Sequence, residues 1–353
     1  MKKIQKHIEI VRSSNKGLSS LSQESCDAIY SLLKRHYCIV GVSIVNNLND
    51  LRNLVSKQPD LVFMGMKYLP SGIADCAAED KKIWLSTYLE QRDIAHTGSA
   101  GEAICLESNK PLAKQRALDA GFTTAPYIVI KRTETGLVAE SSLSYPLFVK
   151  PSRGGGGDGI NDESVVHNLM QLDGKVNSHT INFSGDWLIE QYLPGREFSV
   201  GILKEEYSKR LIAMPLELVT ETNHRGERIL SQEVKSMNLE KTLPVMDVSV
   251  RESVVNMAVG VFKCLGARDY GRIDIRFDEW GNPHFLEANL IPSLIEDYGS
   301  FPKACVVNLG MDYEKMILSI VRLGLERAKP TLEVSENSTV SSIFIPPIEA
   351  VPA

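Results

Sequence analysis

The sequence predicts an α/β domain followed by an α+β region, and two patterns along the chain support this division. In the first hundred residues, apolar strand-like runs alternate with helix-like runs, which is typical of a parallel sheet covered by helices. From Pro126 onward, strand-like runs instead follow one another in hairpin-like succession. The two regions are therefore expected to differ in architecture.

The first region contains three expected strands and two expected helices. The strands are HIEIV, YCIVGVSIV and PDLVFMGM, and the helices are SQESCDAIYSLLKRH and EDKKIWLSTYLEQR. A serine-rich segment from Ser13 to Ser25 would form the loop between the first strand and the first helix. A further helix is expected from about Pro111 to Ala120, where Gly121 would end it.

In the second region, YIVIK and YPLFVKP come first, and DWLIEQYL and EFSVGILK then form an expected hairpin around PGR. RLIAMPLELV follows, and after it a helix is expected from about Val248 to Leu265. YGRIDIRFD and PHFLEANL form a close pair of strands joined at EWGN. The chain is thus expected to divide at 1–100, 101–188 and 189–328, with a peripheral or poorly ordered tail at 329–353 that is rich in Pro, Ser and Glu.

Composition and charge exclude several classes of protein. Of the 353 residues, 43% are hydrophobic and 24% are charged, which is ordinary for a soluble globular protein. The net charge is −5 and the basic residues are scattered, so we expect no binding to nucleic acid or to a membrane. No run reaches the roughly 18 apolar residues of a membrane span, and no signal peptide is evident. The six cysteines form no close pair, which suits a reducing compartment, and we expect a cytoplasmic protein.

The stretch YPLFVKPSRGGGGDGI places four consecutive glycines just beyond an apolar strand that ends in Lys150, with Pro-Ser-Arg between them. Glycine amides can surround phosphate oxygens at close range, and a lysine at the strand end adds a positive charge. The stretch is not a P-loop, because no GK[ST] follows the glycines. A flexible surface loop is the alternative interpretation.

The pair GRIDIRFD and HFLEANL carries the strongest chemical signal. Strand side chains alternate between two faces, so Arg272 and Asp274 share one face, and Glu287 and Asn289 likewise share one. Carboxylate and amide oxygens of this kind suit Mg²⁺, which nucleotide phosphates usually help to bind. The alternative is a hairpin with a solvated polar face.

The segment WLIEQYLPGREF is a candidate for holding a nucleoside. A strand ending in Glu190, Gln191, Tyr192 and Leu193 offers backbone groups and an apolar wall to an adenine ring, and Glu197 lies where it could reach a ribose. An ordinary hairpin would look the same. Lys110, in SNKPLAKQ, is a similarly weak signal when it is taken alone.

Taken together, these segments resemble the ATP-grasp superfamily, and most closely its D-alanine–D-alanine ligase branch. The segments that carry the resemblance are KPSRGGGGDGI, LIEQYLPGREFSVGIL, GRIDIRFDEWGNPHFLEANLIP and the earlier HTGS…SNKPLAKQRALDAGFTTAPY, and their order and spacing match as well. The resemblance covers about Ala95 to Gly324. It implies an N-terminal α/β domain followed by an α+β ATP-grasp fold, with the nucleotide between the central and C-terminal sub-domains.

The resemblance also implies a role for each candidate residue. Arg272, Lys150 and Lys235 would be catalytic: Arg272 stabilises the transferring phosphoryl group, and Lys235 reaches the γ-phosphate. The residues that would bind ATP are Lys110, Lys150, Gly154, Gly155, Gly156, Gly157, Glu190, Gln191, Tyr192, Leu193 and Glu197. The metal ligands would be Asp274, Glu287 and Asn289, holding Mg²⁺ or, as an alternative, Mn²⁺.

The sequence departs from the family at the positions that bind amino acids. The family has a glutamate in the first loop. Here that loop reads VRSSNKGLSSLSQES, and it contains no acid before Glu24. Gly156 and Ser236 stand where the family has a serine and a tyrosine, and the run from Leu290 to Leu294 replaces Thr-Ser-Pro-Gly-Met, with Ser293 in place of the glycine. ATP chemistry is therefore expected to be kept while the amino-acid pocket is rebuilt.

These observations predict an ADP-forming carbon–nitrogen ligase of class EC 6.3.2.-, which joins a small-molecule carboxylate to an amine through an acyl phosphate. A genuine D-alanine–D-alanine ligase is one alternative, and an ATP-binding protein without catalysis is another. The resemblance also allows a homodimer, formed through the N-terminal domain.

Overall fold

The structure of the chain is a computed structural model that describes residues 2–15, 17–71, 82–131, 138, 141–154, 157, 159–178, 185–231, 233–234, 237 and 239–328. Its N-terminal part is a three-stranded sheet in the order β2-β1-β3, and both strand pairs are parallel. The strands are β1 (Ile4–Arg12), β2 (Tyr37–Ile44) and β3 (Leu61–Met64). The parallel sheet predicted for this region is confirmed.

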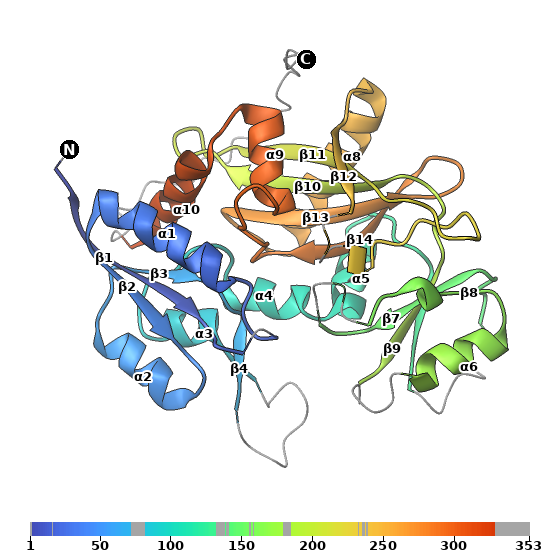
Figure 1. Cartoon of the computed structure of the whole chain (residues 1–353), viewed down its shortest axis with the longest axis horizontal. Coiled ribbons are helices and arrows are strands. Elements are labelled where there is room, and N and C mark those ends of the chain that lie inside the picture. Colours follow the sequence, from blue (N-terminus) through green and yellow to red (C-terminus); the bar gives the residue numbers. More distant parts are fainter. Residues whose placement is uncertain are drawn as a thin grey trace.

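Helices cover both faces of this sheet (Figure 1). On one face, Ile8 and Ile10 pack in a cluster with residues of α1 (Gln23–His36) and of the C-terminal α10 (Tyr313–Arg327). On the other face, Val62 packs with residues of α2 (Leu48–Ser56) and α3 (Leu85–Glu90). The predicted first helix is confirmed, and it begins after Ser22, whose side chain accepts a hydrogen bond from the Ser25 amide.

The helix predicted over EDKKIWLSTYLEQR was wrong in its first part. Lys82–Trp84 forms strand β5, which pairs antiparallel with β4 (Tyr68–Pro70), and within the described part of this segment, 82–92, the helix is limited to α3. The Trp84 and Tyr68 rings meet edge to face with centroids 5.3 Å apart, and such cross-strand aromatic contacts stabilise a strand pair. Farther on, α4 (Gly101–Glu107) precedes α5 (Lys110–Asp119).

A four-stranded antiparallel sheet follows, in the order β6-β9-β7-β8. Its strands are β6 (Tyr127–Ile130), β7 (Leu147–Pro151), β8 (Val165–Val166) and β9 (Trp187–Gln191). The 3₁₀ helix η2 (Asp162–Ser164) leads into β8, and α6 (Leu169–Ser178) follows it. The divide expected after residue 188 lies inside β9, and the expected tail at 329–353 lies outside the described residues.

The hairpin predicted from DWLIEQYL and EFSVGILK was wrong, because β9 and β10 (Glu197–Lys204) belong to different sheets. Backbone donors between the two strands bind other segments: the Tyr192 amide donates to the Pro146 carbonyl and the Gly195 amide to that of Phe277. A Cβ at Gly195 would lie 2.5 Å from the Phe277 oxygen, so only glycine fits there. The turn carries the chain from one sheet to the next instead of reversing it.

The second large sheet is antiparallel and has the strand order β12-β11-β10-β13-β14. The strands beside β10 are β11 (Leu211–Val219), β12 (Lys241–Pro244), β13 (Tyr270–Phe277) and β14 (Pro283–Asn289). Helix α8 (Val248–Cys264) packs on one face with Ile273, and α9 (Ser300–Leu309) packs on the other with Met214. The predicted helix and the predicted pairing of β13 with β14 are confirmed.

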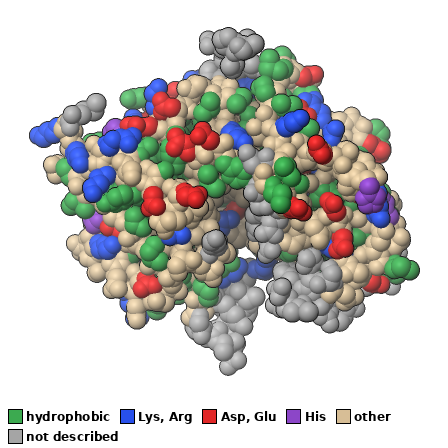
Figure 2. Space-filling model, viewed as in Figure 1, with side chains coloured by type: hydrophobic (Ala, Val, Ile, Leu, Met, Phe, Trp, Pro, Cys, Tyr) green, Lys and Arg blue, Asp and Glu red, His purple; other side chains and the backbone are tan. Residues whose placement is uncertain are grey.

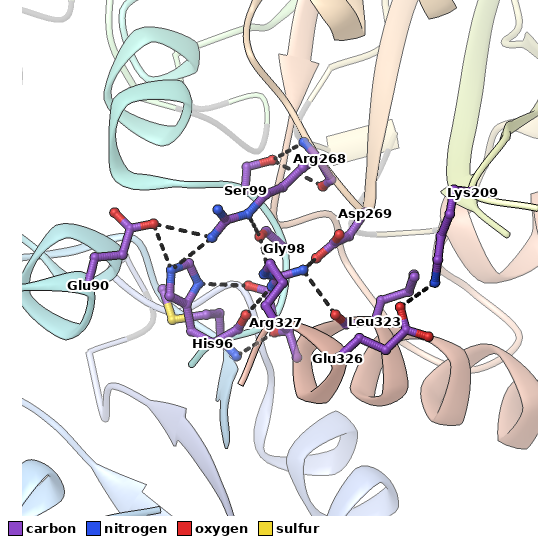
Figure 3. A network of polar contacts seen from close by, with 12 residues as sticks. Glu90, His96, Gly98, Ser99, Lys209, Arg268, Asp269, Leu323, Glu326 and Arg327 are labelled. Atoms are coloured by element: carbon purple, nitrogen blue, oxygen red, sulfur yellow. Dashed lines mark hydrogen bonds and ion pairs between the residues drawn. The ribbon is translucent and has the colours of Figure 1, made fainter. Parts of the chain in front are cut away.

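A network of charged side chains joins the N-terminal region to the five-stranded sheet (Figure 3). Arg327, at the end of α10, pairs with Asp269 and donates to the His96 carbonyl. Arg268 donates to the Gly98 carbonyl at 3.0 Å and pairs with Glu90 at 3.2 Å. These contacts fix the loop after α3 against the start of β13.

Among the described residues, no helix is both long enough and apolar enough to cross a membrane.

Candidate active site

A pocket lies between the four-stranded and five-stranded sheets. In Figure 2 the surface is hollowed near its centre, between the part that holds β1 to β3 and the part that holds β6 to β9. The predicted site residues that line the pocket are Lys150, Glu190, Gln191, Tyr192, Leu193, Glu197, Asp274 and Glu287. Apolar side chains of Ala125, Phe148, Ile160, Leu230 and Leu286 line it as well. The pocket therefore combines an apolar wall, as a base requires, with carboxylates and a lysine.

Glu190 lies between two lysines at the buried end of the pocket. Its carboxylate oxygens are 2.6 Å from Lys114 Nζ and 2.5 Å from Lys150 Nζ. Burial alone would raise the pKa of Glu190, but the two lysines outweigh it and lower this pKa. Burial likewise opposes the charge on Lys150, but Glu190 outweighs it and raises the pKa of Lys150. All three side chains thus carry charge in a place that is shielded from water.

Arg276, a buried residue that also lines the pocket, holds two of the predicted nucleoside ligands in place. Its guanidinium donates to Glu197 Oε2 at 3.1 Å, to the Tyr192 hydroxyl at 3.2 Å and to the Arg228 carbonyl at 2.8 Å. These bonds hold the side chains of Glu197 and Tyr192 in place in the pocket wall. The Gln191 side chain instead donates to the Ser144 carbonyl at 2.8 Å.

Lys110 does not line the pocket, but it lies beside the glycine run and close to Glu287, which does. Its Nζ donates to the Gly154 carbonyl at 2.7 Å and is 4.0 Å from Glu287. Burial lowers the pKa of Lys110, and Glu287 partly opposes this. Gly154 and Gly157 have φ values of 96° and 84°, which side chains rarely adopt. Gly155, Gly156 and Lys235 lie outside the described residues, so their predicted roles stay predictions.

The predicted metal ligands lie on paired positions of β13 and β14. Asp274 is opposite Glu287 and Arg272 is opposite Asn289. Asp274 accepts hydrogen bonds from Arg272 at 2.8 Å, from Asn289 at 3.2 Å and from the Ser199 hydroxyl at 2.9 Å. The face that the sequence predicted therefore forms.

This face fits a magnesium ion only if the ion has further ligands. Two carboxylates and one amide supply oxygens, and the described residues contain no group of three His, Cys, Asp or Glu side chains that could hold an ion. Mg²⁺ typically keeps several waters and shares phosphate oxygens with a nucleotide. The donor set thus suits a metal that arrives with a polyphosphate.

Arg272 is held between Asp274, one of the predicted metal ligands, and helix α9. Its guanidinium donates to the Ser300 hydroxyl at 2.9 Å and to Asp274. Burial opposes its charge, but Asp274 outweighs burial and raises the pKa of Arg272. A positive charge held in this way could stabilise a transferring phosphoryl group.

The segments that correspond to amino-acid binding in the family contain few charges. In the first loop, the Ser13 and Ser14 hydroxyls both donate to Asn46 Oδ1, and Glu24 is exposed on α1. After β14, Leu290 and Leu294 are buried and Ser293 is half-buried. Neither segment presents an acid that could receive an ammonium group.

The comparisons with known proteins agree with this geometry. The family model described as "D-ala D-ala ligase C-terminus" matches residues 117–322, which is more than half of the chain. The chain belongs to the D-alanine–D-alanine ligase family. It is therefore an ATP-dependent ligase with the ATP-grasp fold, as the sequence predicted.

Individual relatives of the family are distant. A D-alanine–D-alanine ligase of Geobacter sulfurreducens is 26% identical over 238 residues, which are 66% of this chain and 70% of the relative. The structure of the Bacillus anthracis D-alanine–D-alanine ligase complexed with ATP matches with a TM-score of 0.69 at 19% identity, over 92% of this chain and 98% of that one. The VanG D-Ala:D-Ser ligase of Enterococcus faecalis matches with a TM-score of 0.64 at 18% identity, over 91% and 99% of the two chains.

Sequence reasoning missed two residues of the site, Lys114 and Arg276. Arg276 lies two positions after Asp274, so the same strand alternation that placed Arg272 and Asp274 on one face could have found it. Lys114 carries no comparable signal, because a lysine on a short helix is usually exposed. Only its contact with Glu190, 76 residues further along the chain, shows its place.

Proposed function

We propose that the protein is an ADP-forming carboxylate–amine ligase whose substrates are not a pair of D-alanines. One observation carries this proposal. On the neighbouring strands β13 and β14, Asp274 is paired with Glu287 and Arg272 with Asn289, and these residues lie beside the pocket that Lys150 lines. Phosphoryl transfer needs positioning and charge stabilisation rather than a protein nucleophile, and this set supplies both.

In the proposed reaction, a substrate carboxylate oxygen attacks the γ-phosphorus of ATP, and ADP leaves. The amine then attacks the acyl carbon of the acyl phosphate, phosphate leaves, and the amine proton passes to solvent. Lys110 and Lys150 would bind the α and β phosphates, Lys235 the γ-phosphate, and Arg272 the transferring group. Glu197 would bind the ribose. Asp274, Glu287 and Asn289 would hold Mg²⁺ or Mn²⁺, whose charge offsets that of the phosphates.

The proposal of other substrates rests on the segments around the amine and acceptor sites. The described part of the first loop binds Asn46 through two serines and presents no acid. A D-alanine–D-alanine ligase is the second candidate, because a relative of that name is 26% identical over two thirds of the chain. A third candidate is a protein that binds ATP without catalysis. It is disfavoured because the arginine, both carboxylates and the asparagine expected of a ligase are all present on β13 and β14.

The test is ADP release in a coupled assay, with amino acids and small acids supplied in pairs. We expect turnover with at least one pair other than D-alanine with itself. Turnover with D-alanine alone would favour the second candidate, and no turnover with any pair would contradict the ligase proposal.

Arg272→Ala tests the chemistry in the same assay. Loss of one donor to a developing charge typically lowers turnover about a hundred- to a thousandfold, while ATP affinity should change only a few-fold. Arg322→Ala is the matched control, since Arg322 pairs with Glu206 on the surface. An unchanged rate in Arg272→Ala would remove this residue from the mechanism.

A further inference from the structure

We infer that Lys114 is a positioning residue of the nucleotide site: it holds Glu190 by a second ion pair and so leaves Lys150 available to the phosphates. This inference rests on the proposed function, because it takes ATP as the ligand of the pocket. It gives Lys114 a role although the residue does not line the pocket.

Glu190 joins the two lysines into one group of buried charges. Lys114 Nζ is 2.6 Å from Glu190 Oε1, and Lys150 Nζ is 2.5 Å from Glu190 Oε2. The side chains of Lys114, Glu190 and Lys150 are 0%, 3% and 6% exposed. Charges that are removed from water to this extent depend on each other, because solvent cannot replace a lost partner.

The two lysines differ in their remaining contacts. Lys114 Nζ also donates to the Thr124 hydroxyl at 2.7 Å and to the Phe285 carbonyl at 3.2 Å, which ties α5 to the segment before β6 and to β14. Lys150 lines the pocket near the end of β7, four residues before the first glycine of the run. Lys114 is therefore fixed on the side of Glu190 that is away from the pocket, while Lys150 lines the pocket itself.

Binding of a polyphosphate changes the demand on Lys150. If Lys150 turned toward phosphate in the absence of Lys114, Glu190 would be left as a buried carboxylate with neither lysine, which is strongly unfavourable. With Lys114 in place, Glu190 keeps a counter-charge when Lys150 moves. Burial lowers the pKa of Lys114 to about 8, so near neutral pH it still carries the charge that this role needs.

The test compares the affinity for Mg·ATP, measured by calorimetry, in variants that lack Lys114, Glu190 or both, and so measures how strongly the effects of the two residues depend on each other. We expect Lys114→Met to weaken ATP binding at least tenfold and to raise KM for ATP more than it lowers kcat. In a Glu190→Gln background, the same substitution should weaken binding less than threefold, because a neutral glutamine no longer retains Lys150.

A purely structural role for Lys114 predicts a different result. It would lower the melting temperature and weaken binding equally in both backgrounds, and that outcome would overturn the inference alone. Absence of ATP binding in the wild type would overturn the proposed function and this inference with it.

Lys57→Met is the matched control, since Lys57 also pairs with a buried carboxylate that has other partners. Glu9 lies 2.9 Å from Lys57 and accepts a hydrogen bond from Ser43, in the N-terminal sheet. We expect this variant to lose thermal stability without a change in ATP affinity. A tenfold loss of ATP affinity here would show that any such lysine matters, and would overturn the specific role of Lys114.

Discussion

Two parts of the proposed site are built in different ways: the nucleotide end, which is the pocket lined by Lys150 and Glu190, and the substrate end, which is the first loop together with the segment after β14. Strands β7, β9, β13 and β14 carry many of the charged residues of the nucleotide end, and buried ion pairs hold several of them. Loops form the proposed substrate end, where Ser13 and Ser14 bind Asn46 and apolar residues follow β14. Strand positions tolerate little change because each side chain packs against neighbours, whereas loops can change without loss of the fold. If the protein has the substrates proposed above, changes in the loops would alter its specificity and would leave the charged strand positions in place.

The largest effect is expected at the nucleotide end, from Glu287→Gln. Its side chain is 21% exposed and faces the pocket, so folding should be nearly unaffected, while ligation should fall at least about a hundredfold and Mg²⁺-dependent ATP binding should weaken. Thermal melts with and without Mg·ATP would measure both effects. A large loss of melting temperature without ligand, with stabilisation by nucleotide intact, would mean that Glu287 is structural and that the metal lies elsewhere.

The same contrast explains which parts of the fold the sequence could predict. The pairing of β13 with β14 was predictable because alternating polar and apolar residues flank a short turn. The partner of β9 was not predictable, because β6 and β7 are both distant from it in sequence, and adjacency wrongly favoured β10. Local pattern determines a hairpin, but it does not determine which of two sheets a strand joins.

The candidate site shows a similar limit. Lys150, Glu190 and Asp274 were predicted from motifs, and the structure places all three at one pocket. The contact of Lys114 with Glu190 depends on how α5 packs against two sheets, and no motif encodes that. Arg276 was overlooked although its position on β13 follows from simple alternation.

A smaller effect is expected at the substrate end, from Ser293→Gly. Ser293 stands where the family has a glycine that admits the second D-alanine, so removing its hydroxymethyl group should enlarge the proposed acceptor pocket. One group of this size in a pocket typically changes kcat/KM about tenfold, and we expect such a gain for D-alanine as the amine in the ADP-release assay. ATP affinity should stay the same. A gain for no amine at all would place the acceptor pocket elsewhere and would weaken the contrast between the two ends.

The smallest effect concerns the charged network between the N-terminal region and the five-stranded sheet, where His96 is 2% exposed (Figure 3). Burial lowers the pKa of His96, Arg268 lowers it further, and Glu90 opposes them. Near pH 6.5 the unfolded chain therefore binds a proton at this histidine that the folded chain does not, so stability is lost as the pH falls through this range.

His96→Gln removes that proton uptake. Between pH 7.5 and pH 5, we expect the wild type to lose more of its free energy of unfolding than the variant, because only the wild type takes up a proton at this position when it unfolds. Urea unfolding at the two pH values measures the difference. If the two proteins lose stability in parallel, His96 makes no contribution to the pH dependence of stability, and the acid sensitivity of the molecule arises from other titratable groups.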